Sequence, residues 1–182
     1  LENSNVVLGP GDDCAILAPI NGQEICLSTD TMNEDVHFLG SMPGDVIASR
    51  VIAANLSDIA AMGADPSACL LAVTLDEVNE IWLDQFSHAI FSNLRHYCCP
   101  LIGGNVSKGP KISITMTVLG SIPAGKALVR SNANIGDGIY VTGFLGDSKV
   151  GLELLRSGKN QDYLVSRYCH PTPRIEEGKA LR

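Results

Sequence analysis

The chain of 182 residues has the length of one medium domain, or of one domain with part of a second. Hydrophobic residues make up 45% of it, which is enough for a packed core and too much for a disordered chain. The formal net charge is −7, from 13 basic and 20 acidic side chains, and the basic residues form no cluster. This argues against a nucleic-acid groove, and an anionic substrate would need metal ions to hold it.

The sequence also bears on membrane association and compartment. No apolar run reaches the roughly 20 residues of a membrane-spanning helix, and the first residues lack the pattern of a signal peptide. Because the chain starts at Leu1, we expect it to begin inside a longer protein. The six cysteines contain no Cys-x-x-Cys pair, and most lie in apolar stretches typical of buried free thiols, with zinc or redox roles as alternatives. We expect a cytoplasmic protein with no membrane partner.

Residues up to 125 give a regular series of predicted elements. In chain order these are strands at 14–19 and 23–28, a helix at 43–62, a strand at 67–75, a helix at 79–97, and strands at 99–102 and 112–122. Asn21-Gly22 predicts a hairpin between the first two strands, because both residues tolerate positive φ. The continuous apolar run at 67–75 predicts a buried strand. This order predicts an α+β fold, a mixed β-sheet with helices on one face.

The pattern changes after residue 125. Residues 126–137 are polar and rich in turn formers, which is typical of a connector. The predicted elements that follow are a strand at 139–142, a helix from about 147 to 156, and helical pieces at 160–169 and 173–182. So few elements do not close a core. We therefore expect residues 1–125 to form an N-terminal domain and residues 138–182 to begin a second, incomplete α/β domain.

Four aspartates, Asp12, Asp13, Asp30 and Asp58, lie in short motifs rich in small residues. Crowded carboxylates repel one another, so a chain that gathers them usually brings in a cation. Hard oxygen ligands indicate Mg²⁺ or Ca²⁺, and Mg²⁺ commonly binds one or two carboxylates together with substrate phosphates. The chain has no Gly-x-x-x-x-Gly-Lys-Ser/Thr phosphate loop. The sequence therefore predicts an acidic, metal-bridged phosphate site.

Each acidic motif also has a plain structural explanation. An Asp-Asp pair in a glycine-rich turn, as at 12–13, is more often structural than a metal site. Residues 28–30 (Ser-Thr-Asp), predicted at a strand end, offer three oxygen ligands, but strand alternation puts only two of these side chains on one face. Asp58 is predicted near the negative end of a helix dipole, which is unfavourable by about 0.3–1 kcal/mol unless solvent or a metal compensates.

Three further motifs are ambiguous from pattern alone. Gly103-Gly104-Asn105 predicts a turn after a strand, and such a turn could also bring backbone N–H groups to a nucleotide phosphate. His37 is more commonly a satisfied loop histidine than a functional one. Arg130 lies in the connector, where most arginines are solvated, although its planar guanidinium suits phosphate.

Taken together and in this order, the motifs resemble the thiamine-monophosphate kinase family, within the superfamily that includes aminoimidazole ribonucleotide synthetase. The matching segments are GDDCAIL (11–17), STDTMNEDVHF (28–38), AANLSDIAAMGADP (53–66), LIGGN (101–105), ALVRS (127–131), GDGIYVTGFLGDS (136–148) and HPTPRIEEGKAL (170–181). They span almost the whole chain, and the second and third are the most specific.

The resemblance implies a Mg²⁺-dependent kinase that phosphorylates thiamine monophosphate with ATP, giving thiamine diphosphate and ADP. The implied Mg²⁺ ligands are Asp12, Asp13, Ser28, Thr29, Asp30, Asp58 and Asn105. The implied thiamine-phosphate contact is His37, and the implied ATP contacts are Gly104, Asn105 and Arg130. The resemblance also implies a homodimer formed through the sheet of the N-terminal domain.

The chain departs from the family pattern in two ways. The family has Asp where this chain has Asn105, whose amide oxygen can bind Mg²⁺ but brings no negative charge. The family's second domain continues past Arg182 with SDGL-like and GGEDYEL-like motifs, so we expect this chain to hold part of a catalytic site. Two alternatives stay open: another ATPase of the superfamily with a different acceptor, and a non-catalytic nucleotide-binding dimerisation module.

Overall fold

The structure is a computed structural model that describes residues 6–8, 16–17, 21–159 and 161–182. The strands are β1 (Val6–Leu8), β2 (Ile16–Leu17), β3 (Gln23–Asn33), β4 (Asp65–Leu75), β5 (Leu101–Lys108) and β6 (Ser113–Pro123). The helices are α1 (Gly44–Ala61), α2 (Glu80–His96), α3 (Asp147–Arg156), α4 (Asp162–Cys169) and α5 (Ile175–Leu181), with a 3₁₀ turn η1 at Arg130–Asn132. No helix in these ranges is both long and apolar enough to cross a bilayer.

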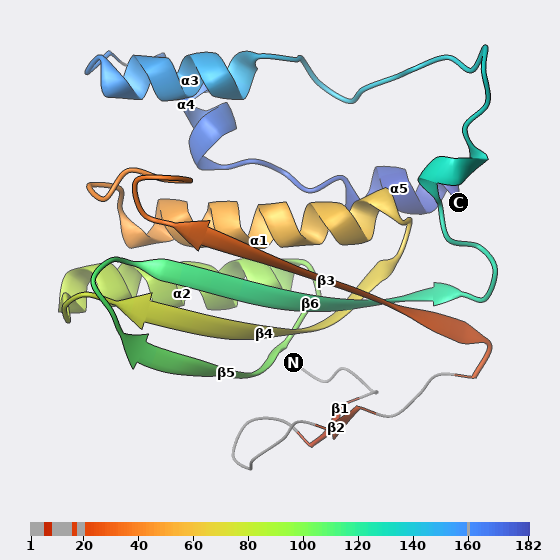
Figure 1. The fold of residues 1–182 in the computed structure, drawn as a ribbon, viewed down its shortest axis with the longest axis horizontal. Helices are drawn as coiled ribbons and strands as arrows, with labels where there is room; N and C mark the ends of the chain where they lie inside the picture. The colour runs from red at the N-terminus through yellow and green to blue at the C-terminus, as the bar shows by residue number, and fades with distance from the viewer. Residues whose placement is uncertain (1–5, 9–15, 18–20, 160) are drawn as a thin grey trace.

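A four-stranded mixed sheet in the order β3-β6-β4-β5 forms the centre of the fold (Figure 1). β6 pairs antiparallel with β3 and β4, while β4 pairs parallel with β5. Residues two apart on β6, including Met116 and Val118, are fully buried on one face, where they meet Ile52 and Leu56 of α1. The predicted α+β fold, with helices on one face of a mixed sheet, is confirmed.

Local signals set the ends of the two long helices. α1 begins directly after Pro43 and is followed by Gly63, which has the positive φ of +70° that a helix stop requires. α2 begins after Asn79, whose side chain accepts a hydrogen bond from the Trp82 N–H at 3.1 Å. Both helices lie within one residue of their predicted bounds, and α3, α4 and α5 are confirmed as well.

Two predictions about the strands near the N-terminus are wrong. β2 pairs with β1, and β3 pairs with β6, so the described residues do not form the hairpin expected around Asn21-Gly22. Gly22 still turns the chain with a φ of +77°, and its carbonyl accepts from the Ala124 N–H at 3.0 Å. β3 is also longer than expected, because it runs on past Asp30 to Asn33. Residues 28–30 therefore lie in mid-strand and not at a strand end.

Two further strands differ from expectation. Gly104 and Asn105 lie inside β5 and not in a turn after it. β4 was expected to be buried throughout, but Leu70 and Ala72 are exposed on the face away from the helices. The sheet is therefore covered on one face by α1 and α2, and its opposite face carries exposed side chains.

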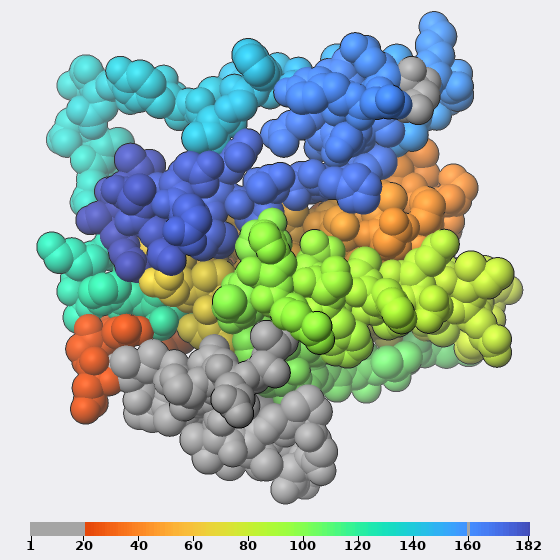
Figure 2. Space-filling model, turned by 180° about the vertical axis from the view of Figure 1, so that it is seen from behind, coloured from red at the N-terminus to blue at the C-terminus, as the bar shows by residue number. Residues whose placement is uncertain are grey.

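The strand predicted at 139–142 is absent. Residues 137–141 have no regular structure, and Ile139 and Tyr140 are more than 90% exposed. A strand needs a neighbour for its backbone groups, and none of the described strands pairs with this segment. The space-filling view shows residues 133–146 standing apart from the body of the molecule, with open space between them (Figure 2).

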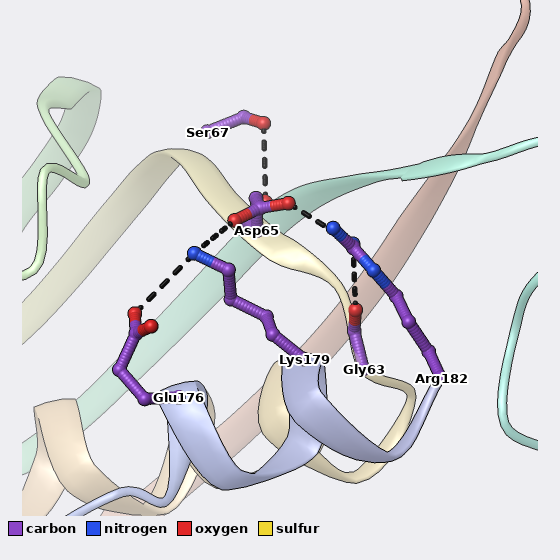
Figure 3. Close-up of polar contacts among 6 residues, drawn as sticks. All are labelled: Gly63, Asp65, Ser67, Glu176, Lys179 and Arg182. Atoms are coloured by element: carbon purple, nitrogen blue, oxygen red, sulfur yellow. Dashed lines mark hydrogen bonds and ion pairs between the residues drawn. The ribbon is translucent and has the colours of Figure 1, made fainter.

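The C-terminal helix α5 is held on the far side of α1 from the sheet by a cluster of charges (Figures 1 and 3). Asp65, at the start of β4, pairs with Lys179 at 2.7 Å and with Arg182 at 3.0 Å. Arg182 also donates to the Gly63 carbonyl at 2.9 Å, and Glu176 lies 3.3 Å from Lys179. Burial opposes ionisation of Asp65, but the hydrogen bonds and charges of Lys179 and Arg182 outweigh it, so the pKa of Asp65 is lowered.

We expect Asp65→Asn to lower the free energy of unfolding by about 1 kcal/mol at pH 7, because the partners remain partly exposed and screened. A carboxyl with a lowered folded-state pKa stabilises the fold above its unfolded pKa of about 3.9, and this contribution is lost as pH falls through the folded pKa. The difference in thermal stability between parent and variant should therefore shrink below about pH 4. Glu153→Gln, which removes exposed ion pairs of α3, is the control and should change little at any pH.

The cysteines largely follow the expectation of structural thiols. Cys69, Cys99 and Cys169 are buried, whereas Cys98 is exposed, and all the cysteines in the described ranges are free. A hydrogen bond with Cys69, together with burial, raises the pKa of the Cys99 thiol far above its ordinary value. Cys99 therefore stays protonated and unreactive near neutral pH.

Candidate functional site

Two hydrogen bonds link β3 to the second half of α1. The Ser28 hydroxyl donates to Asp58 Oδ2, and the Asp30 N–H donates to Asn55 Oδ1 at 3.2 Å. Ser28 and Asp30 are two residues apart on the strand, while Asn55 and Asp58 are about one helical turn apart. The two contacts therefore place the predicted ligands Ser28, Asp30 and Asp58 along one seam between strand and helix.

Thr29 points the other way. Its hydroxyl lies 2.9 Å from the Thr117 hydroxyl and donates to the Met116 carbonyl at 3.0 Å, on the exposed face of the sheet. This is the alternation expected from the sequence, in which two of the three side chains at 28–30 share a face.

An open pocket of about 510 Å³ lies beside the Ser28–Asp58 contact. β3, the end of α1 and the segment that leads into η1 form its walls, and Arg130 lines it together with Ser28 and Asp58. The Leu128 N–H donates to the Met62 carbonyl at 3.0 Å, which anchors this segment to the end of α1. The fold thus brings a connector arginine to the acidic seam, as a phosphate site would require.

The seam suits a hard cation. Asp30 and Asp58 are both exposed, and neither forms an ion pair with any side chain in the described ranges. Carboxylate and hydroxyl oxygens are the donors that Mg²⁺ prefers. The described residues contain no group of three or more His, Cys, Asp or Glu side chains placed to hold a metal, and Asp12 and Asp13 lie outside those residues. The seam alone therefore offers a partial set of ligands.

His37 lies in a tightly organised loop between β3 and α1. Its Nδ1 accepts a hydrogen bond from the Asn33 N–H at 3.0 Å, so in the neutral ring the proton is on Nε2. The loop contains Asp35 with a φ of +62°, and Lys111 pairs with the Asp35 carboxylate at 2.6 Å. The exposed imidazole can therefore offer Nε2–H to a ligand from a fixed loop.

Arg50 of α1 connects this loop to the C-terminal segment. Its Nη2 donates to the His37 carbonyl at 3.1 Å, and its Nη1 donates to the Tyr168 carbonyl at 2.6 Å. The guanidinium also lies 3.9 Å from the centre of the Tyr168 ring. Burial lowers the pKa of Arg50 from its ordinary value. The position of His37 thus depends on α4 as well as on α1.

Gly104 and Asn105 lie at the opposite edge of the sheet from Ser28 and Asp30. Gly104 pairs with Leu71, which is aligned through Met116 with Asp30. Three strand spacings of about 4.8 Å separate the two edges by roughly 14 Å. A Cβ on Gly104 would lie 2.0 Å from the Leu71 carbonyl oxygen, so close packing of β4 and β5 requires glycine there. The fold does not bring these residues to the pocket of Ser28, Asp58 and Arg130.

Two residues of this region, Asn55 and Arg50, were not predicted from the sequence. Asn55 carries a signal in retrospect, because Val51, Asn55 and Ile59 share the apolar stripe of α1 and only Asn55 is polar. Arg50 carries none, since its partners come from distant parts of the chain.

Comparisons with known proteins identify the family of the chain. Residues 11–122, more than half of the chain, match the family described as AIR synthase related protein, N-terminal domain. The chain is 46% identical over 184 residues to thiamine-monophosphate kinase of Escherichia coli K12, a match that covers 98% of this chain and 56% of the relative.

Solved structures give the same result for the fold. The crystal structure of thiamine-monophosphate kinase from Stenotrophomonas maltophilia K279a superposes with a TM-score of 0.90 at 37% identity, covering 99% of this chain and 60% of that one. The structure of AaThiL complexed with AMPPCP and TMP gives 0.82 at 33% identity, covering 90% and 54%.

The predicted resemblance is thus confirmed in sequence and in fold. The chain spans little more than half the length of these relatives. The part it spans includes the Asp30–Asp58 seam, which lies inside the matched family region. The chain belongs to the family of AIR synthase related proteins and contains their N-terminal domain.

Proposed function

We propose that the complete protein is a kinase that transfers the terminal phosphoryl group of ATP to thiamine monophosphate, giving thiamine diphosphate and ADP. Two findings support this: the similarity to thiamine-monophosphate kinases over nearly the whole chain, and the relative AaThiL, which was solved with AMPPCP and TMP. Because this chain spans about half of its relatives, the activity is proposed for the complete protein.

The observation that carries the proposal is the pocket that Ser28, Asp58 and Arg130 line together. In the reaction a phosphate oxygen of thiamine monophosphate attacks the γ-phosphorus of ATP, and the bond from that phosphorus to the bridging oxygen breaks as ADP leaves. Such transfers depend on positioning and on charge stabilisation. Arg130 is suited to bind phosphate oxygens with its planar guanidinium.

Mg²⁺ would supply charge neutralisation at the phosphates. Ser28, Asp30 and Asp58 would hold it from the seam, and we propose Asp12 and Asp13 as further ligands. Asn105 lies roughly 14 Å from Ser28 and Asp30 across the sheet, so the Mg²⁺ that we propose for it is a different ion. Thr29 could contribute only through its main chain, because its hydroxyl is bonded on the other face of the sheet.

We further propose that His37 donates from Nε2 to the phosphate of thiamine monophosphate, because Nδ1 is already occupied by the Asn33 N–H. We also propose that Gly104 and Asn105 contact ATP. Since they lie roughly 14 Å from Ser28 and Asp30 across the sheet, they would contact a different part of the nucleotide, or nucleotide held by a second copy.

The face of the sheet that none of the described helices covers supports a proposed homodimer. Ile25 and Leu27 of β3 are 57% and 66% exposed there, and Leu70 of β4 is partly exposed on the same face. Contiguous exposed apolar side chains of this kind mark contact surfaces. Light scattering on the complete protein measures this directly.

Domain organisation and compartment also remain proposals. We propose that residues 1–125 form the N-terminal domain, that 126–137 connect it, and that 138–182 begin a second domain. The exposure of Ile139, Tyr140 and Phe144 supports this, because strand-like apolar residues need partners that the described chain does not provide. A cytoplasmic location rests on the free thiols of the described cysteines.

The test is ³¹P NMR of the complete protein incubated with ATP, Mg²⁺ and thiamine monophosphate. New resonances of thiamine diphosphate, absent when EDTA is added, are the expected result. Loss of ATP without that product would move the proposal to another acceptor in the same superfamily. Unchanged spectra from folded protein would contradict a kinase and favour a non-catalytic nucleotide-binding module.

A further inference from the structure

Asn55 is the one fully buried residue with a polar side chain that the described core contains. Its Nδ2 donates to the Val51 carbonyl, one turn earlier in α1, at 2.9 Å. Its Oδ1 accepts from the N–H of Asp30 on β3 at 3.2 Å. Both ends of the carboxamide are therefore bonded, one within the helix and one to the strand.

A buried amide needs a reason, because a leucine at this position would add apolar packing without polar groups to satisfy. The bond to Val51 does not explain the amide, because the Val51 carbonyl lies inside α1 and already accepts a main-chain hydrogen bond of the helix. The contact with β3 is a reason, because β3 is an edge strand that β6 alone holds among the described strands. The Asp30 N–H faces β6, where Asp30 is in register with Met116, and Asn55 adds an acceptor from the helix that covers this face of the sheet.

The contact joins the two elements that carry the proposed carboxylate ligands, which are β3 with Asp30 and α1 with Asp58. Asp58 lies about one turn after Asn55 on the helix. On the strand, Asn55 accepts from the main-chain N–H of Asp30, and the side chain of Asp30 is the other proposed carboxylate ligand. The Ser28–Asp58 hydrogen bond holds the strand at Ser28, two residues before Asp30. Without Asn55, the main chain at Asp30 would lose its connection to the helix that carries Asp58.

We propose that Asn55 is a positioning residue for cation binding: it fixes the main chain at Asp30 so that Asp30 and Asp58 present their carboxylates together. The inference rests on the proposed function, because it assumes that this seam holds the metal. It predicts that Asn55 acts on metal affinity, although its side chain is buried and bonded away from the pocket.

The test compares Asn55→Leu with Asn93→Leu in the complete protein. Asn93 makes the same bond in α2, from Nδ2 to the Ala89 carbonyl at 2.9 Å, but its side chain bonds to none of the described strands. Binding of Mn²⁺ in the presence of a non-hydrolysable ATP analogue is followed by electron paramagnetic resonance. The Mg²⁺ concentration for half-maximal turnover is measured alongside.

We expect Asn55→Leu to weaken Mn²⁺ binding and to raise the Mg²⁺ requirement by about tenfold or more, with much of kcat recovered at saturating Mg²⁺. Asn93→Leu should leave both values at the parent level. If Asn55→Leu fails to fold, the shorter Asn55→Ser serves in the same comparison, because it too withdraws the amide oxygen from the Asp30 N–H.

Two results would overturn the inference, and they are distinguishable. Parent-like Mn²⁺ affinity in a folded Asn55 variant with only a lower melting temperature would make Asn55 purely structural, while the kinase stands. A parent protein that binds no Mn²⁺ and yields no thiamine diphosphate would remove the proposed function and the inference with it.

Discussion

Replacing Asp58 with Asn is expected to lower turnover of ATP and thiamine monophosphate by the complete protein by about 10²–10³-fold. The asparagine keeps an oxygen that can accept from the Ser28 hydroxyl, so the contact between β3 and α1 can persist. What is lost is one negative charge beside the pocket that Arg130 lines. Initial rates at saturating substrate, measured over a range of Mg²⁺ concentrations, provide the measurement.

Asp84→Asn is the matched control. Asp84 is an exposed aspartate of α2 whose one ion pair within the described residues is with His88, at 3.6 Å, so the substitution should leave the rate unchanged. A near-parental rate in Asp58→Asn, with the fold intact, would contradict the assignment of the seam as the metal site. An equal loss in both variants would point to a general effect of charge.

The sequence was sufficient for the parts of the fold that local chemistry determines. α1 follows from its apolar spacing, Pro43 and Gly63, and α2 follows from its apolar side. The alternation of Ser28, Thr29 and Asp30 across β3 was likewise predictable, because strand geometry has a fixed period.

Strand pairing was not predictable in the same way. Asn21-Gly22 is a strong turn signal, and a turn does form there, but β3 pairs with β6 from far along the chain. Partners at such a distance are chosen by the packing of the whole sheet, which no local motif encodes. The same limit applies to residues 139–142, whose strand-like pattern finds no partner among the described strands.

The candidate site shows a similar division. The residue types were apparent from the motifs, but the place of Arg130 in the same pocket as Ser28 and Asp58 depends on how the connector folds onto the end of α1. Asn55 was missed because an asparagine in a helix usually lies on its exposed side. Its importance follows from its contact with Asp30, which only the packed structure shows.

Gly178→Ala is expected to release α5 from α1, although alanine normally favours a helix by about 1 kcal/mol over glycine. A Cβ at Gly178 would lie 2.0 Å from the Ala60 carbonyl oxygen, which is backbone and cannot rotate away. α5 would have to move outward, which would strain the pairs of Lys179 and Arg182 with Asp65. Overpacking of this kind costs about 1–3 kcal/mol.

Hydrogen exchange followed by mass spectrometry on residues 170–182 measures the release, and these amides should exchange faster in Gly178→Ala than in the parent. Ala180→Leu is the control, because Ala180 is exposed on the same helix and added volume there meets solvent. Unchanged exchange in Gly178→Ala would mean that α5 does not pack on α1 as closely as the structure has it. Faster exchange that extends to the last turn of α1 would show that a helix from the far end of the chain supports the segment that carries Asp58, since Ala60 lies only two residues beyond it.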